Sequence, residues 1–232
     1  MKEVTVIIPA HNEEKHIGIV IEHIKKEEVI KEIIVVANSC NDNTEIVAKK
    51  AGAKVIRCMK KGKGYAMEAG LKRAKGQIIA FLDGDIINYM DNVVTTMVKP
   101  IIKGKVDFVK TKFDREGGRV TELLAKPLLE ILFPELAGFS QPLSGTIACR
   151  KVILEQMVFD KDYGVDIGIL LDSYNMGARI KEVHIGNLKN DSQDWKSLTK
   201  MSKQVAEAIL KRTSYIPQEV YNNEFRVIEQ VI

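Results

Sequence analysis

The stretch QIIAFLDGD, residues 77–85, decides the expected fold and points to the chemistry of this chain. Its apolar run, residues 77–82, predicts a buried strand. Asp83, Gly84 and Asp85 follow where this strand leaves the core. Two carboxylates placed there can hold Mg²⁺ or Mn²⁺ against a diphosphate, because both ions prefer oxygen ligands. Acidic residues beside a glycine are also ordinary turn chemistry, so the flanking sequence must decide between a metal site and a plain turn.

Strand and helix patterns alternate on the N-terminal side of this stretch. Strands are predicted over residues 4–8, 32–36, 54–57 and 77–82, and helices over residues 17–24, 42–52 and 65–75. This order predicts an α/β protein with a parallel, doubly wound sheet. In such sheets ligands bind beyond the carboxyl ends of the strands. We therefore expect the polar loops at residues 9–14, 37–42, 59–64 and 83–85 to form one pocket.

The C-terminal half continues the alternation with less regularity. Helices are expected over residues 90–103, 120–132 and 195–212, a strand over residues 106–113, and a helix–strand pair within residues 164–185. A Gly- and Pro-rich passage, residues 134–145, precedes a further strand and then this helix–strand pair. We expect a single domain over residues 1–213, with parts at 1–113 and 114–213, followed by a tail at residues 214–232.

Composition narrows the class of protein. The 232 residues include 35 basic and 31 acidic side chains, and the net charge is +4. Basic residues are spread along the chain, which argues against nucleic acid as a partner, whereas a mildly basic surface suits an anionic small molecule. No uncharged apolar run approaches membrane-spanning length, and the chain enters a strand at Val4 without room for a signal peptide. We expect a cytoplasmic protein without stable membrane insertion.

The cysteines give no sign of a disulfide framework or of a zinc site. Cys40, Cys58 and Cys149 are widely spaced and odd in number. This pattern fits neither paired disulfides nor zinc-ligand spacing. We expect three buried thiols.

Several motifs together resemble one family. The general ones are residues 6–14 (VIIPAHNEE), 62–64 (GKG) and 83–85 (DGD), and the narrower ones are residues 117–123 (GGRVTEL), 126–129 (KPLL), 134–136 (PEL), 141–145 (QPLSG) and 163–168 (YGVDIG). With them the chain resembles nucleotide-sugar-dependent glycosyltransferases of the GT-A fold, and within these the retaining glucosyl-3-phosphoglycerate synthases. The resemblance implies a Rossmann-like, mostly parallel sheet flanked by helices. It also implies glucose transfer from UDP-glucose to 3-phosphoglycerate, with Mg²⁺ or Mn²⁺.

The resemblance implies a donor site in the N-terminal part. The residues it assigns to the nucleotide sugar are Pro9, Ala10, Glu13, Asn38, Lys63, Asp83, Gly84 and Tyr163. Lys63 stands between two glycines, which let the backbone approach a diphosphate. Glu13 is equally explained as an acid at a helix N-terminus, and Lys63 as a solvated lysine. Ala37 and Asn38 depart from the acidic pattern usual at the base-reading position.

The same resemblance divides the carboxylates by role. Asp85 is expected to be the main metal ligand, which makes UDP a better leaving group. Asp83 is expected to contact the ribose or sugar hydroxyls, or the metal through water. Asp166 matches an acid near the transferred sugar and is expected to orient the donor, although it could simply be an early-helix acid. Asp83 and Asp166 are thus the predicted catalytic pair, and front-face attack assisted by the leaving phosphate is the mechanism usually inferred.

The acceptor is expected to bind at the start of the predicted helix at residue 120. The resemblance assigns Gly118, Arg119, Thr121 and Ser192 to it. Arg119 can clamp a phosphate or carboxylate with two hydrogen bonds, and free backbone donors at a helix N-terminus also suit an anion. A capped helix start with a surface arginine is the structural alternative.

The largest departure from the family lies at residues 186–192. Asn190 occupies the position of the family's metal-binding histidine, and Ser192 replaces an acceptor-contacting asparagine. Asn190 could still offer a carbonyl oxygen to the metal, and Asp191 could do so better. His184 is a further alternative, although we expect it to be a packed or hydrogen-bonded core residue.

Three alternatives remain open from the residues alone. The chain could use another nucleotide sugar such as GDP-mannose, use another acceptor, or bind a nucleotide sugar without turnover. Six apolar side chains, Leu123, Leu124, Leu128, Ile131, Leu132 and Phe133, could form core or a dimer face. We expect core, with a possible homodimer contact.

Overall fold

The structure is a computed structural model that describes residues 3–114, 118–188 and 194–213. Its strands are β1 (Val4–Ala10), β2 (Ile30–Asn38), β3 (Lys54–Cys58), β4 (Ile78–Phe81), β5 (Phe108–Lys112), β6 (Ile147–Arg150) and β7 (Ile180–His184). Across the described ranges they form one seven-stranded sheet in the order β3-β2-β1-β4-β6-β5-β7. The sheet therefore continues from the N-terminal part of the chain into the C-terminal part.

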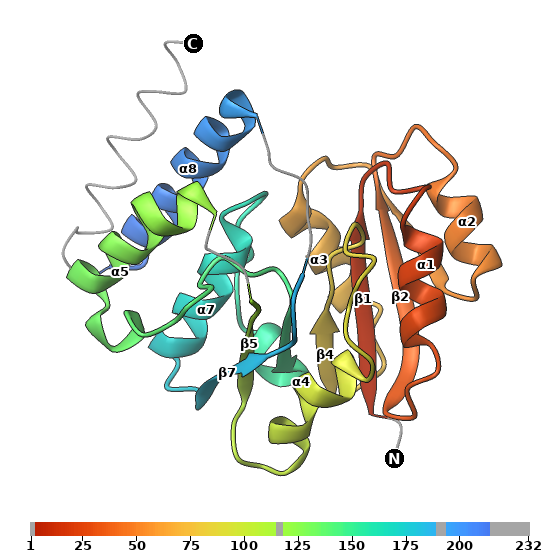
Figure 1. The fold of residues 1–232 in the computed structure, drawn as a ribbon, viewed down its shortest axis with the longest axis horizontal. Coiled ribbons are helices and arrows are strands. Elements are labelled where there is room, and N and C mark those ends of the chain that lie inside the picture. Colours follow the sequence, from red (N-terminus) through yellow and green to blue (C-terminus); the bar gives the residue numbers. More distant parts are fainter. Residues whose placement is uncertain (1–2, 115–117, 189–193, 214–232) are drawn as a thin grey trace.

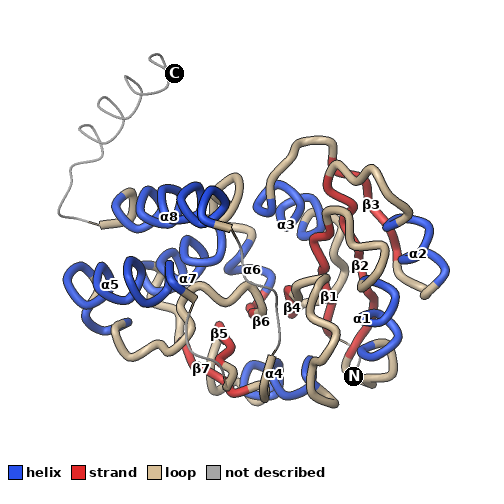
Figure 2. The backbone as a smooth tube through the Cα atoms, turned by 45° about the horizontal axis from the view of Figure 1, so that its top comes forward, coloured by secondary structure: helices blue, strands red, loops and turns tan. Residues whose placement is uncertain are grey.

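Helices cover both faces of the sheet (Figures 1 and 2). They are α1 (Ile17–Ile24), α2 (Thr44–Lys50), α3 (Lys63–Leu71), α4 (Val93–Ile102), α5 (Lys126–Leu132), α6 (Lys151–Leu154), α7 (Val165–Asn175) and α8 (Trp195–Leu210). A π-helical turn at Thr121–Ala125 precedes α5, and a 3₁₀ turn at Pro134–Leu136 follows it. Within the described part of the chain, no helix is long and apolar enough to cross a bilayer.

The strand directions confirm a mostly parallel sheet. β1 pairs in parallel with β2 and β4, β2 pairs in parallel with β3, and β5 pairs in parallel with β7. β6 is the exception, because it runs antiparallel to both β4 and β5. The carboxyl ends of β1, β2, β3 and β4 therefore lie at one edge of the sheet, as the alternation of elements predicted.

Two apolar layers hold the helices to the sheet. On one face Ile8 packs with residues of α1 and α4, among them Ile17 and Met97. On the other face Ile7 and Phe81 pack with residues of α3 and α7. Because side chains alternate across a strand, the unbroken apolar runs of β1 and β4 supply both layers. Each fully buried aliphatic or aromatic side chain contributes about 1.5–3 kcal/mol, so these central strands give a firm base for the loops at their ends.

Most helices are one to three residues shorter at an end than predicted, and two differ by more. α3 begins at Lys63 and ends at Leu71, whereas the sequence pattern predicted residues 65–75. The chain turns back early because Gly76 is packed against β1, where a Cβ would lie 2.5 Å from the backbone nitrogen of Thr5. The helix predicted over residues 120–132 is divided into a π-turn and α5, and Pro127 lies in the first turn of α5. Proline lacks the N–H that a continuous α-helix needs.

Two expectations about burial were partly wrong. Cys149 is buried, but Cys40 and Cys58 are partly exposed, since Cys58 ends the edge strand β3 and Cys40 lies in the loop after β2. On the π-turn and α5, Phe133 is buried, whereas Leu123 is 77% and Ile131 is 70% exposed. These two side chains lie on the outer face of the helical layer and are not core. The homodimer contact stays a prediction.

Candidate active site

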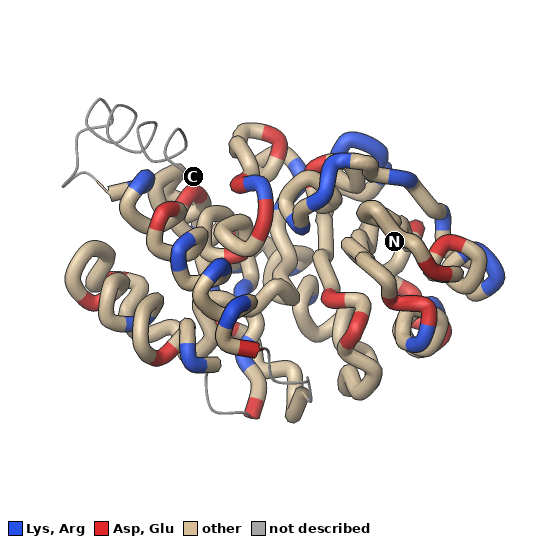
Figure 3. Tube along the Cα trace, turned by 90° about the horizontal axis from the view of Figure 1, so that it is seen from above, with Lys and Arg blue, Asp and Glu red and all other residues tan. Residues whose placement is uncertain are grey.

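A cleft of about 460 Å³ opens at the carboxyl ends of the central strands. It is lined by every described residue that the sequence assigned to the donor, the metal or the catalytic pair: Pro9, Ala10, Glu13, Asn38, Lys63, Asp83, Gly84, Asp85, Tyr163 and Asp166. Seen from this end, acidic and basic positions are interleaved along the trace (Figure 3). The predicted meeting of the loops at one edge is thus confirmed.

An ion network lies at the floor of the cleft. Nζ of Lys63 donates to Oδ1 of Asp83 at 2.8 Å and to Oδ2 of Asp166 at 2.9 Å. Lys63 comes from the start of α3, Asp83 follows β4, and Asp166 lies in the first turn of α7. Three elements far apart in the sequence therefore meet at one ammonium group. Two of the three N–H donors of Lys63 are used in this way.

Burial and the neighbouring opposite charges shift the pKa values of Lys63 and Asp166 in opposite directions. Burial of the Lys63 ammonium opposes its charge, but attraction to Asp166 and Asp83 outweighs burial and raises the pKa of Lys63. Burial raises the pKa of Asp166; Lys63 opposes that shift, and repulsion from Asp83 adds to it. Lys63 is consequently a fixed cation in the apo protein, and Asp166 depends on neighbouring cations to stay ionised.

Glycines make the approach of these groups geometrically feasible. Gly62 has a φ of +140°, a region that side chains rarely adopt. A Cβ on Gly62 or Gly64 would overlap the backbone carbonyl oxygens of residues 160–161. The amide of Gly64 in turn donates to the carbonyl oxygen of Lys161 at 3.1 Å. The Gly-Lys-Gly loop is thereby clamped against the segment that leads into α7, which places Lys63 beside Asp166.

A buried tyrosine holds the backbone of the acidic triplet. The hydroxyl of Tyr89 accepts from the amide of Asp83 at 3.0 Å and donates to its carbonyl oxygen at 3.3 Å. It also lies 3.1 Å from Oγ1 of Thr146. Tyr89 is 5% exposed, and its burial raises its pKa well above the ordinary value. A neutral phenol therefore fixes the direction in which the Asp83 carboxylate leaves the strand.

Asp85 stands apart from the ion network. Its side chain is exposed at the open side of the cleft. Enclosure by the cleft walls raises the pKa of Asp85 to about 6, with repulsion from Asp83 and Glu13 as the next causes. Because the side chain is exposed to solvent, repulsion from these two neighbouring negative charges is the main physical cause of the raised pKa. Among the described residues Asp85 forms no ion pair, Lys63 offsets the repulsion only in part, and an incoming cation would relieve the rest.

Asn38, which was predicted to contact the nucleobase, holds the loop before α3 in place. Its Nδ2 donates to the carbonyl oxygens of Lys60 at 2.7 Å and Cys58 at 3.3 Å, and its Oδ1 accepts from the amide of Gly62 at 2.8 Å. The side chain is 4% exposed. Its amide group is therefore directed into the loop before α3. Recognition of the base by Asn38 stays a prediction, and any such contact would compete with these bonds.

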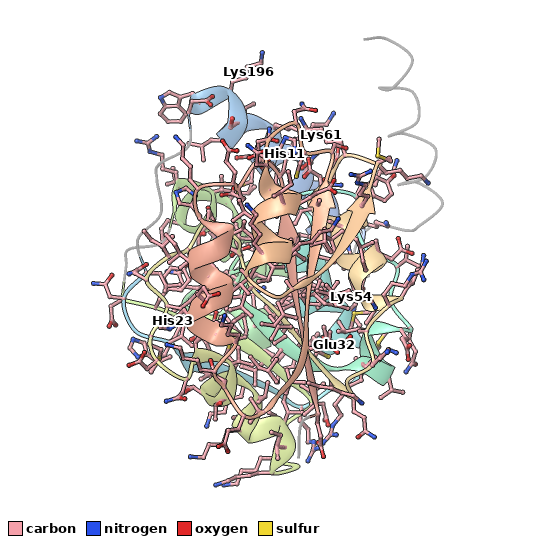
Figure 4. All side chains as sticks on the ribbon, turned by 90° about the vertical axis from the view of Figure 1, so that its right-hand side faces the viewer. His11, His23, Glu32, Lys54, Lys61 and Lys196 are labelled. Carbon is pink, nitrogen blue, oxygen red and sulfur yellow. The ribbon has the colours of Figure 1, made fainter. Side chains whose placement is uncertain are left out.

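His11 is a polar group beside Asn38 that the sequence did not single out. Nδ1 of His11 lies 2.7 Å from the carbonyl oxygen of Asn38. Because a carbonyl can only accept, Nδ1 carries the proton in this pairing. His11 and Lys61 both line the cleft and lie toward the same end of the molecule, whereas Glu32 and Lys54 lie further down (Figure 4).

The three described residues predicted for the acceptor, Gly118, Arg119 and Thr121, do not line the cleft. Arg119 is exposed, and its guanidinium stacks 4.7 Å from the ring centre of Trp195 at the start of α8. Thr121 is buried in the π-turn, and the carbonyl oxygen of Gly118 accepts from the amide of Glu122 at 3.0 Å. The turn and α8 are thus joined at Arg119. Ser192 lies outside the described residues.

The third metal ligand is not found among the described residues. Asn190 and Asp191 lie outside them, and the described part contains no group of three or more His, Cys, Asp or Glu side chains arranged around a metal. His184 is hydrogen-bonded, as expected, but it is not a core residue. Its side chain is 47% exposed, and Nε2 lies 2.8 Å from Oδ1 of Asp114. His184 is the last residue of β7, which is an edge strand of the sheet and, among the residues that the structure describes, has no neighbouring strand on one side.

Sequence reasoning missed Lys110. This lysine lies in β5 and is fully buried, and its Nζ donates to the backbone carbonyl oxygen of Asp166 at 2.7 Å. A signal was available, because Lys110 shares its strand face with Phe108, a core residue. A lysine at an inward position of a strand is uncommon unless it is paired.

Comparison with known proteins gives consistent matches. The model of glycosyl transferase family 2 matches residues 5–160. A glucosyl-3-phosphoglycerate synthase of Mycolicibacterium paratuberculosis is 34% identical over 91% of this chain and 72% of its own length. A structure of that synthase from Mycobacterium tuberculosis, in complex with Mn²⁺, UDP-glucose and phosphoglyceric acid, matches with a TM-score of 0.87 and 35% identity over 91% of this chain and 79% of its own. A second structure, with Mg²⁺ and UDP, has the same TM-score and identity and covers 93% and 80%.

Proposed function

Since the chain belongs to glycosyl transferase family 2, we propose that it transfers glucose from UDP-glucose to 3-phosphoglycerate, with retention of configuration and with Mg²⁺ or Mn²⁺ as cofactor. It is a glycosyltransferase with the GT-A fold. The observation that carries the proposal is the convergence of Lys63, Asp83, Asp85 and Asp166 in one cleft. With a divalent cation bound at Asp85, this set would offer positive charge to a diphosphate, and Asp166 would offer a carboxylate to the sugar beside it.

The diphosphate would bind between Lys63 and Asp85. Lys63 uses two N–H donors on Asp83 and Asp166, and a diphosphate oxygen would take the third. Two carboxylates hold the ammonium group of Lys63 in place. Its third N–H is therefore directed at the diphosphate position before the substrate binds. The uridine would occupy the part of the cleft lined by Pro9, Ala10 and Glu13.

The donor set fits a hard divalent cation. Mg²⁺ in phosphate-handling sites is usually held by one or two carboxylates together with substrate oxygens and waters. Asp85, with Asp83 nearby, supplies this number of carboxylates, and their mutual repulsion is the cost that a cation removes. The bound ion would supply charge neutralisation on the departing UDP. Asn190 or Asp191 would complete the set.

The glucosyl unit would lie against Asp166. Oδ1 of Asp166 is buried and has no hydrogen-bond partner among the described residues, although its carboxylate lines the cleft. A buried carboxylate oxygen without a donor is costly, and rotation of the carboxyl group toward the cleft would let a sugar hydroxyl satisfy it. Asp166 would thereby orient the ring, while Tyr163 on the same wall would pack against it.

The acceptor would be held by Arg119. Its planar guanidinium is already oriented by stacking on Trp195, and such a fork matches a phosphate or a carboxylate with two hydrogen bonds. 3-Phosphoglycerate carries both groups. Its free hydroxyl would attack the anomeric carbon on the face from which UDP leaves, and its proton would pass to the departing phosphate oxygen. This front-face route requires no enzymic nucleophile.

A substrate panel tests the proposal. The purified protein is incubated with Mg²⁺, one nucleotide sugar from UDP-glucose, GDP-mannose and others, and either 3-phosphoglycerate or buffer. The proposal predicts release of nucleoside diphosphate only with UDP-glucose and 3-phosphoglycerate together. Equal release with and without 3-phosphoglycerate would contradict the proposed acceptor. Release from GDP-mannose but not from UDP-glucose would contradict the proposed donor. Binding of UDP-glucose without any release would favour a non-catalytic protein.

A further inference from the structure

Lys110 is a fully buried charge-bearing side chain behind the cleft. It lies in β5 between β6 and β7, opposite Ile147 on one side and Glu182 on the other. None of its surface reaches solvent, and it does not line the cleft. It therefore cannot contact a substrate, and any effect on the reaction must pass through a neighbour.

That neighbour is Asp166. Nζ of Lys110 donates to the backbone carbonyl oxygen of Asp166 at 2.7 Å, in the first turn of α7. A fully buried lysine is expensive, because removal of an ammonium from water costs several kcal/mol that packing alone does not recover. An apolar side chain would fill the same space at lower cost. The presence of lysine here consequently calls for a partner, and the partner is the residue proposed to hold the sugar.

The charges around Lys110 are nearly balanced. Burial lowers the pKa of Lys110 to about 7, while attraction to Asp166 opposes this and repulsion from Lys63 adds to it; Asp83 and Glu182 attract it more weakly. At pH values below about 7, two ammonium groups thus stand against the two carboxylates of the cleft floor. Without Lys110, Lys63 alone would have to balance both Asp83 and Asp166.

The carboxylate of Asp166 has two different oxygens. Oδ2 accepts from Lys63 at 2.9 Å, whereas Oδ1 is buried without a partner in the described structure. An unpaired buried oxygen favours protonation of the carboxyl group. A protonated Asp166 would release Lys63 and would offer the sugar a different hydrogen-bonding pattern.

We propose that Lys110 is a positioning residue for the donor sugar. It fixes the first turn of α7 through the carbonyl oxygen of Asp166 and supplies a second positive charge that keeps the Asp166 carboxylate ionised, so that the cleft-facing edge of this carboxylate can accept from a glucosyl hydroxyl. This inference rests on the proposed function, since it concerns the sugar end of the same site. Lys110 lies outside the cleft, and recognition of the sugar depends on it, whereas recognition of UDP does not.

The experiment compares Lys110→Met with Lys112→Met. Methionine keeps the length of the side chain and removes its charge. Lys112 lies two residues further along β5, is 43% exposed and lies 3.8 Å from Glu182, so it controls for loss of a lysine from this strand. Dissociation constants of UDP and of UDP-glucose are measured with Mg²⁺ by calorimetry, together with the turnover number and the melting temperature.

For Lys110→Met we expect the UDP dissociation constant to stay within about threefold of wild type. The ratio of the UDP-glucose to the UDP dissociation constant should rise about tenfold, and turnover should fall about a hundredfold. Lys112→Met should match wild type in all three. A purely structural role would weaken both ligands alike, so an unchanged affinity ratio would overturn the proposal.

A second variant covers loss of folding. Lys110→Gln keeps an N–H donor for the Asp166 carbonyl oxygen and removes the charge. We expect its affinity ratio to rise by less than in Lys110→Met but clearly above wild type, and a wild-type ratio in a folded Lys110→Gln would overturn the charge argument. Failure of the proposed function is distinguishable, because wild-type protein would then not transfer glucose to 3-phosphoglycerate, while the affinity ratio would still report on Lys110.

Discussion

Gly145 faces Lys63 across the cleft with no room for a side chain. A Cβ built on Gly145 would overlap Nζ of Lys63 and would lie 2.7 Å from Oδ1 of Asp83. Gly145 thus leaves the space in which the ammonium and the carboxylate meet. The closeness explains why a glycine ends the Gln141–Gly145 segment at the cleft wall, just before β6.

Gly145→Ala should therefore separate Lys63 from Asp83. All three atoms that the new methyl group would meet, Nζ of Lys63 and both carboxylate oxygens of Asp83, are ends of side chains, so the fold should tolerate the change at a cost of about 1 kcal/mol. UDP affinity should fall about tenfold or more because the ammonium is displaced. Calorimetry and thermal melting measure the two effects. Gly138→Ala, at an exposed position with nothing within 4 Å, is the control, and equal behaviour of the two variants would count against the role of Gly145.

Asn38→Asp should loosen the loop before α3. The aspartate keeps the shape but loses the two donors to the carbonyl oxygens of Lys60 and Cys58, and it places a negative charge against them. We expect a loss of about 1–3 kcal/mol in stability and weaker UDP binding, measured by urea unfolding and calorimetry. Asn41→Asp, at an exposed position, is the matched change. Wild-type stability of Asn38→Asp would mean that the loop does not depend on these bonds.

Asp85→Asn should stabilise the metal-free protein in a pH-dependent way. The folded-state pKa of about 6 lies above the ordinary value of 3.8. The folded protein therefore binds more protons between these values, and ionised Asp85 lowers stability above pH 6. This cost fades as pH falls toward 3.8, so the gain in melting temperature of Asp85→Asn should be largest near about pH 8 and vanish near about pH 4.

The same variant also tests the metal site. Added Mg²⁺ with UDP should raise the melting temperature of wild type and should do so much less in Asp85→Asn. Asp91→Asn, whose side chain is 94% exposed, controls for loss of a carboxylate. An equal rise in all three proteins would remove Asp85 from the proposed ligands.

Arg119→Ala should separate the acceptor from the donor. Loss of the guanidinium should raise the KM for 3-phosphoglycerate about a hundredfold, because a bidentate contact to an anion is lost. The UDP dissociation constant should stay unchanged, since Arg119 does not line the cleft. Arg57→Ala is the control, because Arg57 is exposed and pairs with Glu45. Loss of UDP binding in Arg119→Ala would refute the acceptor assignment.

The donor-binding residues could be predicted because each of them lies at or near the end of a strand or helix that the sequence pattern reveals. Asp83 and Glu13 follow strands whose apolar runs are readable, and parallel strands bring such loops together. Lys110 and Gly145 were not assigned roles, since their importance depends on strand register and on a contact across the cleft. Asn38 was placed correctly in the cleft, but the sequence could not reveal that its amide is directed into the loop at Lys60. His184 was misplaced because an apolar strand pattern does not tell which strand lies at an edge.

The most direct measurement follows the glucosyl carbon itself. The protein is incubated with Mg²⁺, 3-phosphoglycerate and UDP-glucose labelled with ¹³C at the anomeric carbon, and the products are followed by NMR. The account predicts an α-linked glucosyl phosphoglycerate, with the same configuration as the donor, formed in step with UDP and absent without acceptor. Formation of free glucose at the same rate with and without 3-phosphoglycerate, or a β-linked product, would contradict it.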